Sequence, residues 1–514
     1  MFIIFGMTEL QNRQEKIQIK RKQTPWRDFV MEICSWKPLM FYKNSGMISI
    51  YPTERAHKVL KSWQYYDQIS DLDVIGGSFF ENIAQLIHQN GYPATNLMQT
   101  ENSDFSDTTI RSKNIYLSNT VITECENIMY SFSVKDKSNT VFDSIMVRKQ
   151  CENVYKSRCI IESYNIFYSN NIHNSNNVWF SSNLIGCSEC ILCDDLSNQS
   201  YCIQNKQYTK EQYSEFKNKV LQQKDIFHNA HGQQWHNIAS SNITGSSNIE
   251  CHDCEHTFLS FNTKQWRNLI LMGSSEGASN VYDCLTGGSP YAHDFYGVMW
   301  AGASEQVYCS MFVNGWCSNI YYCIDMEACS FCLWCIGLKN KSYCILNTQY
   351  TKEERYIKVD EIFWQMERDD TLWEFFPATM NPFYFNDTAA YLIDNSFTKE
   401  EVTAKWYLRR DEPIKVDIPE GMEIVKTSEL DKYEGWQDSQ GRVILNSFQD
   451  LDAEINSAWH IRWINADILK KVIQDEQWNV YRIIPMEYKF LAKHGLPLPR
   501  KHWLERMKEN FKIN

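Results

Sequence analysis

A short motif recurs between residues 112 and 190 and decides the fold class. It reads Ser112-Lys-Asn114-Ile115, Cys125-Glu-Asn127-Ile128, Ser138-Asn-Thr140-Val141, Cys151-Glu-Asn153-Val154, Ser163-Tyr-Asn165-Ile166, Ser175-Asn-Asn177-Val178 and Cys187-Ser-Glu189-Cys190, with spacings of 13, 13, 13, 12, 12 and 12 residues. A short fixed period indicates stacked units, and a polar residue before a β-branched one suits a turn that leads into a strand. The stretch predicts a mainly β fold, a parallel β-solenoid of 12-13-residue units, with the asparagines stacked and the Ile and Val side chains pointing inward.

A second series follows, and both series end in the same sequence. Its units are Asn268-Leu269, Asn280-Val281, His293-Asp294, Gln306-Val307, Asn319-Ile320 and Phe331-Cys332. Residues 187–212 and 329–354 match at 16 of 26 positions without a gap, so this cassette indicates a duplicated solenoid. In each copy a capping box, Thr209 with Gln212 or Thr351 with Glu354, predicts the start of a helix. We expect two units per coil of about 25 residues, with one unit per narrow coil as the alternative.

The pattern divides the chain into six regions. We predict an N-terminal mixed α/β cap at 1–102, solenoid segments at 103–208 and 237–350, a helical insert at 209–236, and a helix at 351–370. A C-terminal α/β region with a degenerate zinc-ribbon-like end is predicted at 371–514. The flanking regions are expected to cap the ends, because a solenoid has open strand edges to cover.

Charge and cysteine usage restrict the function. The net charge of −12 disfavours nucleic acid and anionic membranes as partners, because both need a basic surface. The apolar run Met1–Met7 is too short for a secretory signal and has no cationic region before it, so we expect a cytoplasmic protein. Of 18 cysteines, 17 lie between Cys125 and Cys344, and in the cytoplasm they would be reduced thiols.

Several stretches resemble one family. These are residues 338–353 (LKNKSYCILNTQYTKE), Trp373-Glu-Phe-Phe-Pro377, Asn381-Pro-Phe-Tyr-Phe-Asn386, Arg482-Ile-Ile-Pro, Leu496-Pro-Leu-Pro-Arg500 and Gly46-Met-Ile-Ser-Ile-Tyr-Pro52. They are similar to a family of uncharacterised proteins of candidate phyla radiation bacteria, some of which carry the name CaiB/BaiF CoA-transferase, an activity that these residues do not support. The resemblance implies cysteine-paired zinc ribbons near the ends. This chain departs from that pattern, because Cys34 alone precedes residue 125 and no cysteine follows Cys344.

Tryptophan is frequent and glycine is rare, with 17 Trp beside 20 Gly. The resemblance implies glycine at Trp334, Trp373, Trp406 and Trp478. Some bacteria of that group read the codon UGA as glycine, so we predict that some of these tryptophans are glycines in the natural protein.

Two clusters could hold zinc. The first is the cassette set Cys187, Cys190, Cys193 and Cys202, repeated as Cys329, Cys332, Cys335 and Cys344, since four thiolates suit zinc or an iron–sulfur cluster. The second combines Cys251 and Cys254 with His252 and His256. We favour no metal, because cysteine alternates with serine in the repeat column and behaves there as a small buried residue. Alternation along a strand would also place Cys251 and Cys254 on opposite faces.

Catalytic candidates are few. Asp283, His293 and Asp294 could act as acid and base on a polysaccharide, although a solvated turn is the explanation that we favour. Aromatic residues two positions after the asparagine column, such as Phe142 and Tyr155, predict a packed layer; an exposed stacking stripe is the alternative. We therefore expect a structural or interaction protein with an unknown protein or a polysaccharide as its partner. The alternative is a carbohydrate-active hydrolase or lyase on the same scaffold.

Overall fold

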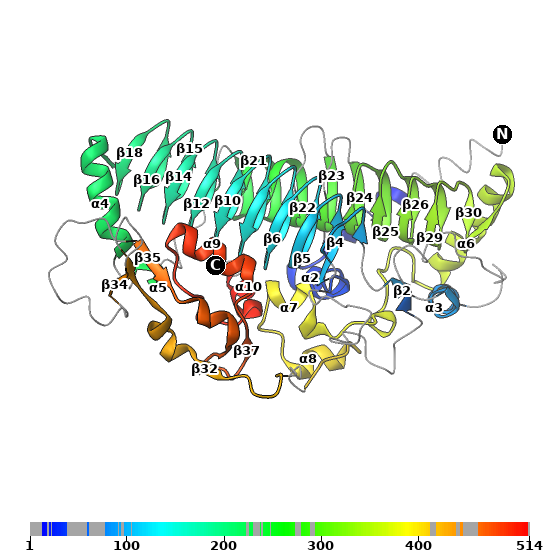
Figure 1. Ribbon diagram of the computed structural model, residues 1–514. Coiled ribbons are helices and arrows are strands. Elements are labelled where there is room, and N and C mark those ends of the chain that lie inside the picture. Colours follow the sequence, from blue (N-terminus) through cyan, green and yellow to red (C-terminus); the bar gives the residue numbers. More distant parts are fainter. Residues whose placement is uncertain are drawn as a thin grey trace.

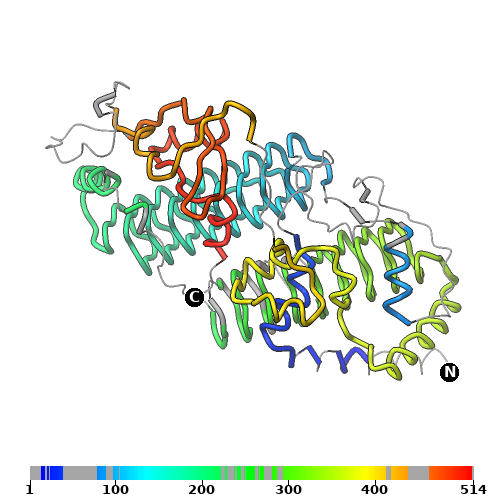
Figure 2. Tube along the Cα trace, turned by 90° about the horizontal axis from the view of Figure 1, so that it is seen from below, coloured from blue at the N-terminus to red at the C-terminus, as the bar shows by residue number. Residues whose placement is uncertain are grey.

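The computed structural model describes residues 13–17, 20–21, 23–38, 59–60, 78–90, 92–93, 97–103, 105–222, 226–229, 237, 240–246, 248–272, 279–287, 293–411, 418–437, 443–445 and 461–511. Two β-solenoid arms dominate it: arm 1 (residues 97–207) and arm 2 (residues 241–349). The arms extend from the middle of the molecule in opposite directions, so that α4 (Lys210–Gln222) and α6 (Lys352–Arg368) lie at its two ends (Figures 1 and 2). The fold is mainly β, as predicted.

Nearly all strands of the two arms are short and parallel. Arm 1 contains β3 (Leu97–Met98), β4 (Phe105–Ile110), β5 (Lys113–Ile122), β6 (Glu126–Met129), β7 (Phe132–Lys135), β8 (Asn139–Phe142), β9 (Ile145–Arg148), β10 (Glu152–Tyr155), β11 (Arg158–Ile161), β12 (Tyr164–Phe167), β13 (Asn170–His173), β14 (Asn176–Trp179), β15 (Ser182–Ile185), β16 (Ser188–Ile191), β17 (Asp194–Ser197), β18 (Ser200–Ile203) and β19 (Lys206–Gln207). Arm 2 contains β20 (Ser241–Ser246), β21 (Ile249–Phe258), β22 (Phe261–Met272), β23 (Ser279–Gly287), β24 (His293–Ala301), β25 (Glu305–Asn314), β26 (Ser318–Tyr321), β27 (Ile324–Glu327), β28 (Ser330–Leu333), β29 (Ile336–Lys339), β30 (Cys344–Ile345) and β31 (Thr348–Gln349).

The remaining elements flank the arms. Towards the N-terminus lie α2 (Trp26–Glu32), η1 (Cys34–Trp36), β1 (Val59–Leu60), α3 (Phe79–Asn90) and β2 (Tyr92–Pro93), and between the arms lies α5 (Ile226–Asn229). After arm 2 come η3 (Ala378–Met380), η4 (Phe385–Asp387), α7 (Ala389–Ile393), α8 (Lys399–Ala404), β32 (Ile424–Lys426), η5 (Thr427–Tyr433), β33 (Glu434–Gln437), β34 (Val443–Leu445), β35 (Ile461–Ile464), η7 (Ala466–Lys470), β36 (Val472–Gln474), β37 (Val480–Tyr481), α9 (Pro485–His494) and α10 (Trp503–Phe511).

Each repeat unit forms one complete coil. In arm 1, Glu126 pairs with Asn139, which pairs with Glu152, which pairs with Tyr164, all in parallel register. One coil therefore takes 12 or 13 residues and holds two short strands. Our expectation of two units per 25-residue coil was wrong, and the narrow-coil alternative is correct.

The narrow coil results from left-handed residues at every third position. In the coil that starts at Ser163, positive φ angles occur at Asn165 (56°), Tyr168 (52°), Asn171 (52°) and Asn174 (48°). Each left-handed residue turns the chain, and asparagine tolerates this conformation better than most residues do. Of the two residues between successive left-handed residues, one points into the coil. Inward-pointing side chains therefore recur at every third residue, and not at every second residue as in an ordinary strand.

The predicted columns are confirmed. Ile115, Ile128, Val154, Ile166 and Val178 are buried in the core of arm 1. The asparagine side chains outside them form a ladder, in which the amide N–H of one residue donates to the side-chain oxygen of the next. The distances are 3.1 Å from Asn114 to Asn127, 2.9 Å from Asn153 to Asn165 and 2.8 Å from Asn165 to Asn177. Such a ladder adds a side-chain hydrogen bond between the coils it joins, and it is interrupted at Thr140, whose hydroxyl donates to Asn139 (2.8 Å).

Serine and cysteine occupy the other inward columns, where they are small enough to fit and also form hydrogen bonds. The Ser144 hydroxyl donates to the carbonyl of Phe142 (2.8 Å) and accepts from the N–H of Ser157 in the next coil (3.1 Å). Cysteine repeats this arrangement, because the Cys317 thiol accepts from the N–H of Cys329 (3.2 Å). Inside the coil, where no water is available, these pairs satisfy backbone groups that would otherwise be costly to bury.

Both arms end in a hairpin and a helix. The last parallel strand turns back as an antiparallel strand, β18 with β19 and β30 with β31. The helices α4 and α6 follow, and both predicted capping boxes are present: the Gln212 N–H donates to the Thr209 hydroxyl (3.3 Å), and the Glu354 N–H donates to the Thr351 hydroxyl (3.3 Å). The duplicated cassette therefore forms the two outer ends.

The C-terminal region lies along the flanks of both arms and does not cap their ends: Trp373 stacks on Tyr322 of arm 2, whereas α9 and α10 lie along arm 1 (Figure 1). The predicted aromatic layer lies outside the coil, where Phe490 of α9 packs on Phe142 (4.5 Å between ring centroids) and on Tyr155 (5.8 Å). The Arg506 guanidinium of α10 donates to Asp143 (2.6 Å) and to Glu487 (2.9 Å). Our expectation that this region is an end cap was wrong, because the aromatic column itself needs a cover.

The register of arm 2 differs from the predicted series at two units. Val281 pairs with Phe295 and with Trp266, so Asp294-Phe295, and not His293-Asp294, forms the unit, and Asn268-Leu269 lies in a different column. The two coils involved are longer than the usual 12 or 13 residues. The first runs from Lys264 to its pairing partner Ser279, and the second runs from Ser279 to its pairing partner His293. These insertions disrupt the period that the sequence pattern relies on.

Candidate functional site

A change in coil length creates a step on the outside of arm 1. Three successive coils carry one extra left-handed residue at the same corner: Glu124, Lys137 and Gln150. These residues, here called the ledge, stack on one another, with the Lys137 N–H bonded to the Thr123 carbonyl (2.8 Å) and the Gln150 N–H bonded to the Asp136 carbonyl (2.7 Å). The next coil has only Glu162 at this corner, so the ledge ends there.

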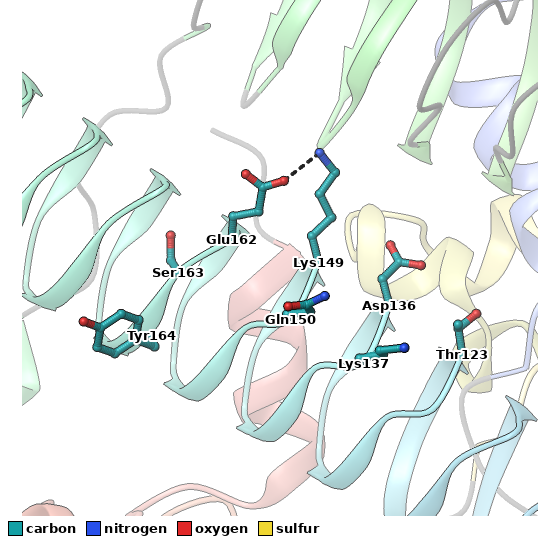
Figure 3. Close-up of a pocket in the computed structure, with 8 residues that line it drawn as sticks. All are labelled: Thr123, Asp136, Lys137, Lys149, Gln150, Glu162, Ser163 and Tyr164. Atoms are coloured by element: carbon teal, nitrogen blue, oxygen red, sulfur yellow. Dashed lines mark ion pairs between the residues drawn. The ribbon is translucent and has the colours of Figure 1, made fainter.

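A shallow depression of about 500 Å³ opens at this step. It is lined by Thr123, Asp136, Lys137, Lys149, Gln150, Glu162, Ser163 and Tyr164. These residues lie on successive coils, with the Lys149 and Glu162 side chains directed toward each other (Figure 3). The Tyr164 side chain leaves strand β12 and is 49% exposed. We call this site the step depression.

The charges of the step depression are matched to one another. Two acidic and two basic residues line it, and Lys149 pairs with Glu162 at 2.9 Å. Lys137 pairs with Glu124 of the ledge at 3.5 Å, and Asp136 pairs with Arg148 at 3.6 Å. Exposed pairs of this kind contribute little to stability. Their effect here is that the surface offers hydrogen-bonding groups with almost no net charge.

The step depression was not predicted from the sequence, although a signal for it exists. The motif spacing changes from 13 to 12 residues at Ser163, beside Tyr164. A coil shortened by one residue must lose one outward side chain at a corner. The depression lies where that loss occurs.

Asp283 is a buried structural residue. Its side chain is 0% exposed, accepts from the Asn268 amide (2.7 Å) and from the Arg21 guanidinium (3.3 Å), and lies beneath the N-terminal segment. Burial raises the pKa of Asp283 to about 6, against the opposing effect of Arg21. Gly297, one coil further along, has φ 62°, and a β-carbon there would come within 3.3 Å of Arg21 Nε, so this column is shaped to admit the arginine.

His293 and Asp294 lie on another face of the same arm. The His293 Nδ1 atom is 3.2 Å from Asp294 and its Nε2 atom is 3.1 Å from Glu305. Asp294 also accepts from the Asn280 amide (3.1 Å), so it occupies the ladder column. The structure therefore places Asp283 against the N-terminal segment and Asp294 in the ladder, and the two carboxylates do not face each other across a cleft.

The cassette cysteines lie inside the coils. Cys187, Cys190, Cys193 and Cys202 are buried, as are Cys329, Cys332, Cys335 and Cys344. Cys190 and Cys202 are neighbours in register, and the Cys190 thiol is hydrogen-bonded to Cys187 and to Cys193. Hydrogen bonds from Cys190 lower the pKa of Cys187 to about 6 and also lower the pKa of Cys193. In the second cassette, Cys332 contacts Cys329, Cys335 and Cys344 in the same way.

The cysteine and histidine pairs of β21 are separated by the coil wall. Cys251 and Cys254 both point inward and are at most 2% exposed, whereas His252 is exposed and its Nδ1 atom is 2.8 Å from the Ser241 hydroxyl. The expectation that the two cysteines lie on opposite faces was wrong, because the inner period is three. Within the described ranges, no group of three or more His, Cys, Asp or Glu side chains is arranged to hold a metal ion.

The zinc ribbons that the family resemblance implies do not fit this chain. Cys34, the one cysteine of the flanking regions, is buried in η1, and a tetrahedral site needs four ligands. None of the helices described by the structure is long and apolar enough to cross a membrane. No family model, no curated protein and no solved structure matches the chain.

Proposed function

We propose that this chain is a structural or interaction protein that presents the flank of arm 1 to a protein or polymer partner. The observation that carries this proposal is the step depression, a solvent-facing site built from successive coils. The asparagine ladder and the serine column hold these coils in register. A surface fixed by hydrogen bonds in every coil loses little conformational freedom when a partner binds.

Binding is favoured over catalysis by the state of the two carboxylates in the step depression. Asp136 and Glu162 both line it, as a glycosidase would require, but each is paired with a cation, Arg148 at 3.6 Å and Lys149 at 2.9 Å. A glycosidase uses two carboxyl groups that face each other across the scissile bond, whereas each carboxyl group here faces a cation. A hydrolase or lyase on this scaffold is the alternative.

The proposal includes a cytoplasmic location and disfavours nucleic acid as the partner. All 18 cysteines are free thiols, which suits a reducing compartment. The net charge of −12 opposes attraction to a phosphate backbone.

Site-specific photo-crosslinking tests the proposal. A photoreactive residue at Tyr164 is compared with one at Tyr356, an exposed tyrosine of α6 that lies outside the step depression. In an extract of the source cells we expect covalent adducts at position 164 and none at position 356. Equal labelling at both positions would contradict a specific surface. Shortening of a polysaccharide by the purified protein, abolished by Glu162→Gln, would favour the enzyme.

A further inference from the structure

We propose that the step depression and the asparagine ladder beside it bind a neutral polysaccharide that lies along the axis of arm 1. This inference deepens the proposed function and rests on it, because it names the chemical class of the partner. Three properties of the site lead to it: the balanced charges, the exposed tyrosine ring, and the period of the ladder.

The balanced charges favour a neutral ligand. The cations and carboxylates that line the step depression are paired with each other or with the adjacent residues Glu124 and Arg148. An anionic polymer would have to displace these carboxylates, and a cationic polymer would have to displace the lysines. Hydroxyl groups can bond to paired ions without separating them, because carboxylate oxygens and ammonium protons have capacity for further hydrogen bonds.

Tyr164 supplies an apolar platform. It is 49% exposed, unlike the aromatic residues of the neighbouring flank, Phe142 and Tyr155, which α9 covers. A tyrosine ring combines an apolar face with a polar hydroxyl. The C–H face of a sugar ring can stack on such a face while its hydroxyl groups reach the Gln150 amide, which lines the same depression.

The ladder favours a polymer over a single sugar. Asn165 follows Tyr164 directly and is half-buried, and its amide donates to Asn177 (2.8 Å). A ladder amide has two N–H groups, and the ladder bonds of Asn153 and Asn165 each use only one of them. Successive coils present these groups about 4.8 Å apart, which gives a row of donors along the axis beside the depression.

The position on the flank disfavours a peptide strand as the ligand. An extended peptide usually binds by adding a strand to an open sheet edge. At the step depression, strand β12 is already paired with β10 on one side and β14 on the other. Side chains alone are available there, and they suit a hydroxyl-rich chain.

Affinity electrophoresis of the full-length protein in gels that contain soluble polysaccharides tests the inference. The probes are a neutral β-glucan, a neutral α-glucan, a neutral galactomannan and, for comparison, polygalacturonate. We expect at least one neutral polymer to retard the protein, with little change as salt is raised. Tyr164→Ala should weaken this binding about tenfold, Tyr164→Phe should retain it, and the matched control Tyr356→Ala should leave it unchanged.

Each other outcome overturns the inference in a distinguishable way. Binding to polygalacturonate alone, lost at high salt and in Lys149→Gln, would assign an anionic ligand. Binding that is equally weakened by Tyr356→Ala and Tyr164→Ala would place the ligand elsewhere. If no polymer binds while crosslinking at position 164 still gives specific protein adducts, the polysaccharide is wrong and the proposed function stands. If neither binding nor specific crosslinking occurs, both fail.

Discussion

Trp406 and Gly495 occupy the same position at the ends of two helices. Trp406 has φ 66°, its N–H bonds to the Thr403 carbonyl (3.0 Å), and the N–H after it bonds to the Val402 carbonyl (3.2 Å). Gly495 has φ 63°, and the corresponding bonds go to Ala492 (3.5 Å) and Leu491 (2.9 Å). This is the Schellman arrangement, in which glycine is the preferred residue because it has no β-carbon.

Replacing Trp406 with glycine should therefore stabilise the protein. The ring is 71% exposed and packs little, while the left-handed backbone costs a residue other than glycine roughly 1–2 kcal/mol. We expect Trp406→Gly to raise the free energy of unfolding by about 1 kcal/mol, measured by urea denaturation. The control is Trp364→Gly in the middle of α6, where glycine should lower that free energy by about 1 kcal/mol. A loss of stability in Trp406→Gly would contradict the prediction.

Trp478 leads to a prediction about the gene. It is the third of the three residues between Asp475 and Asn479, whose N–H and carbonyl are hydrogen-bonded (3.0 Å). It has φ 66° and is 76% exposed, at a position that glycine favours in three-residue hairpins. Trp334 and Trp373 also have positive φ (59° and 68°), but both are buried and Trp373 stacks on Tyr322. We expect UGA codons at 406 and 478. If all four positions are encoded by UGG, the glycine hypothesis is wrong and the exposed rings need another explanation.

The sequence predicted what repeats in every coil and missed what does not. The inward position of Ile128 and the ladder contact of Asn153 followed from spacing alone. The coil size did not, because the spacing gives the length of a unit but not the number of turns within it. Those turns come from left-handed residues such as Tyr168, and nothing in a tyrosine marks that conformation.

The environment of the catalytic candidates could not be predicted for a related reason. Asp283 resembled a solvated carboxylate in the sequence, but its buried position depends on Arg21, which is 262 residues away along the chain. The step depression was predictable in principle from the change in spacing at Ser163, but its shape depends on which side chains remain at the shortened corner.

The serine column gives a stability prediction that separates size from hydrogen bonding. Ser144 bonds to a carbonyl in its own coil and to an N–H in the next. Ser144→Ala leaves that N–H buried without its partner, so we expect a loss of roughly 1–3 kcal/mol in the free energy of unfolding. Ser144→Cys should cost less, since cysteine fills the equivalent position at Cys317. The exposed Ser197→Ala is the control. Equal losses in the alanine and cysteine variants would show that hydrogen bonding in this column is unimportant.

We also predict that the purified protein carries less than one zinc or iron per chain. The thiols of Cys190 and Cys332 are hydrogen-bonded to other buried thiols in columns that serine shares. Elemental analysis of protein purified without chelators measures the metal directly. Two equivalents of metal, lost in the variants Cys190→Ser and Cys332→Ser, would reverse the prediction, because bound metal requires its four ligands.

The last prediction concerns the contact between α9, α10 and arm 1. Glu487 and Asp143 share one arginine, Arg506, in a buried site, and the charge of the buried Lys156 also acts on Asp143. Burial raises the pKa of Glu487 to about 7, and it raises the pKa of Asp143 as well. Folded protein therefore binds a proton at Glu487 that the unfolded chain releases above its ordinary pKa of about 4.3.

It follows that the contribution of Glu487 to the free energy of unfolding is present at low pH and is lost as pH rises from about 4.3 to about 7. His494 and His502 act in the opposite direction below their ordinary pKa of about 6.5, because burial lowers the pKa of each to about 4.

The wild-type profile mixes these effects, so the variant must be compared with it at each pH. We expect the free energy of unfolding of Glu487→Gln, minus that of the wild type, to increase between pH 5 and 7 by at most about 1.4 kcal/mol per pH unit. Urea denaturation at several pH values measures this difference, with the exposed Glu476→Gln as the control. A difference that stays constant over this range would show that Glu487 is ionised throughout and that Arg506 compensates both carboxylates.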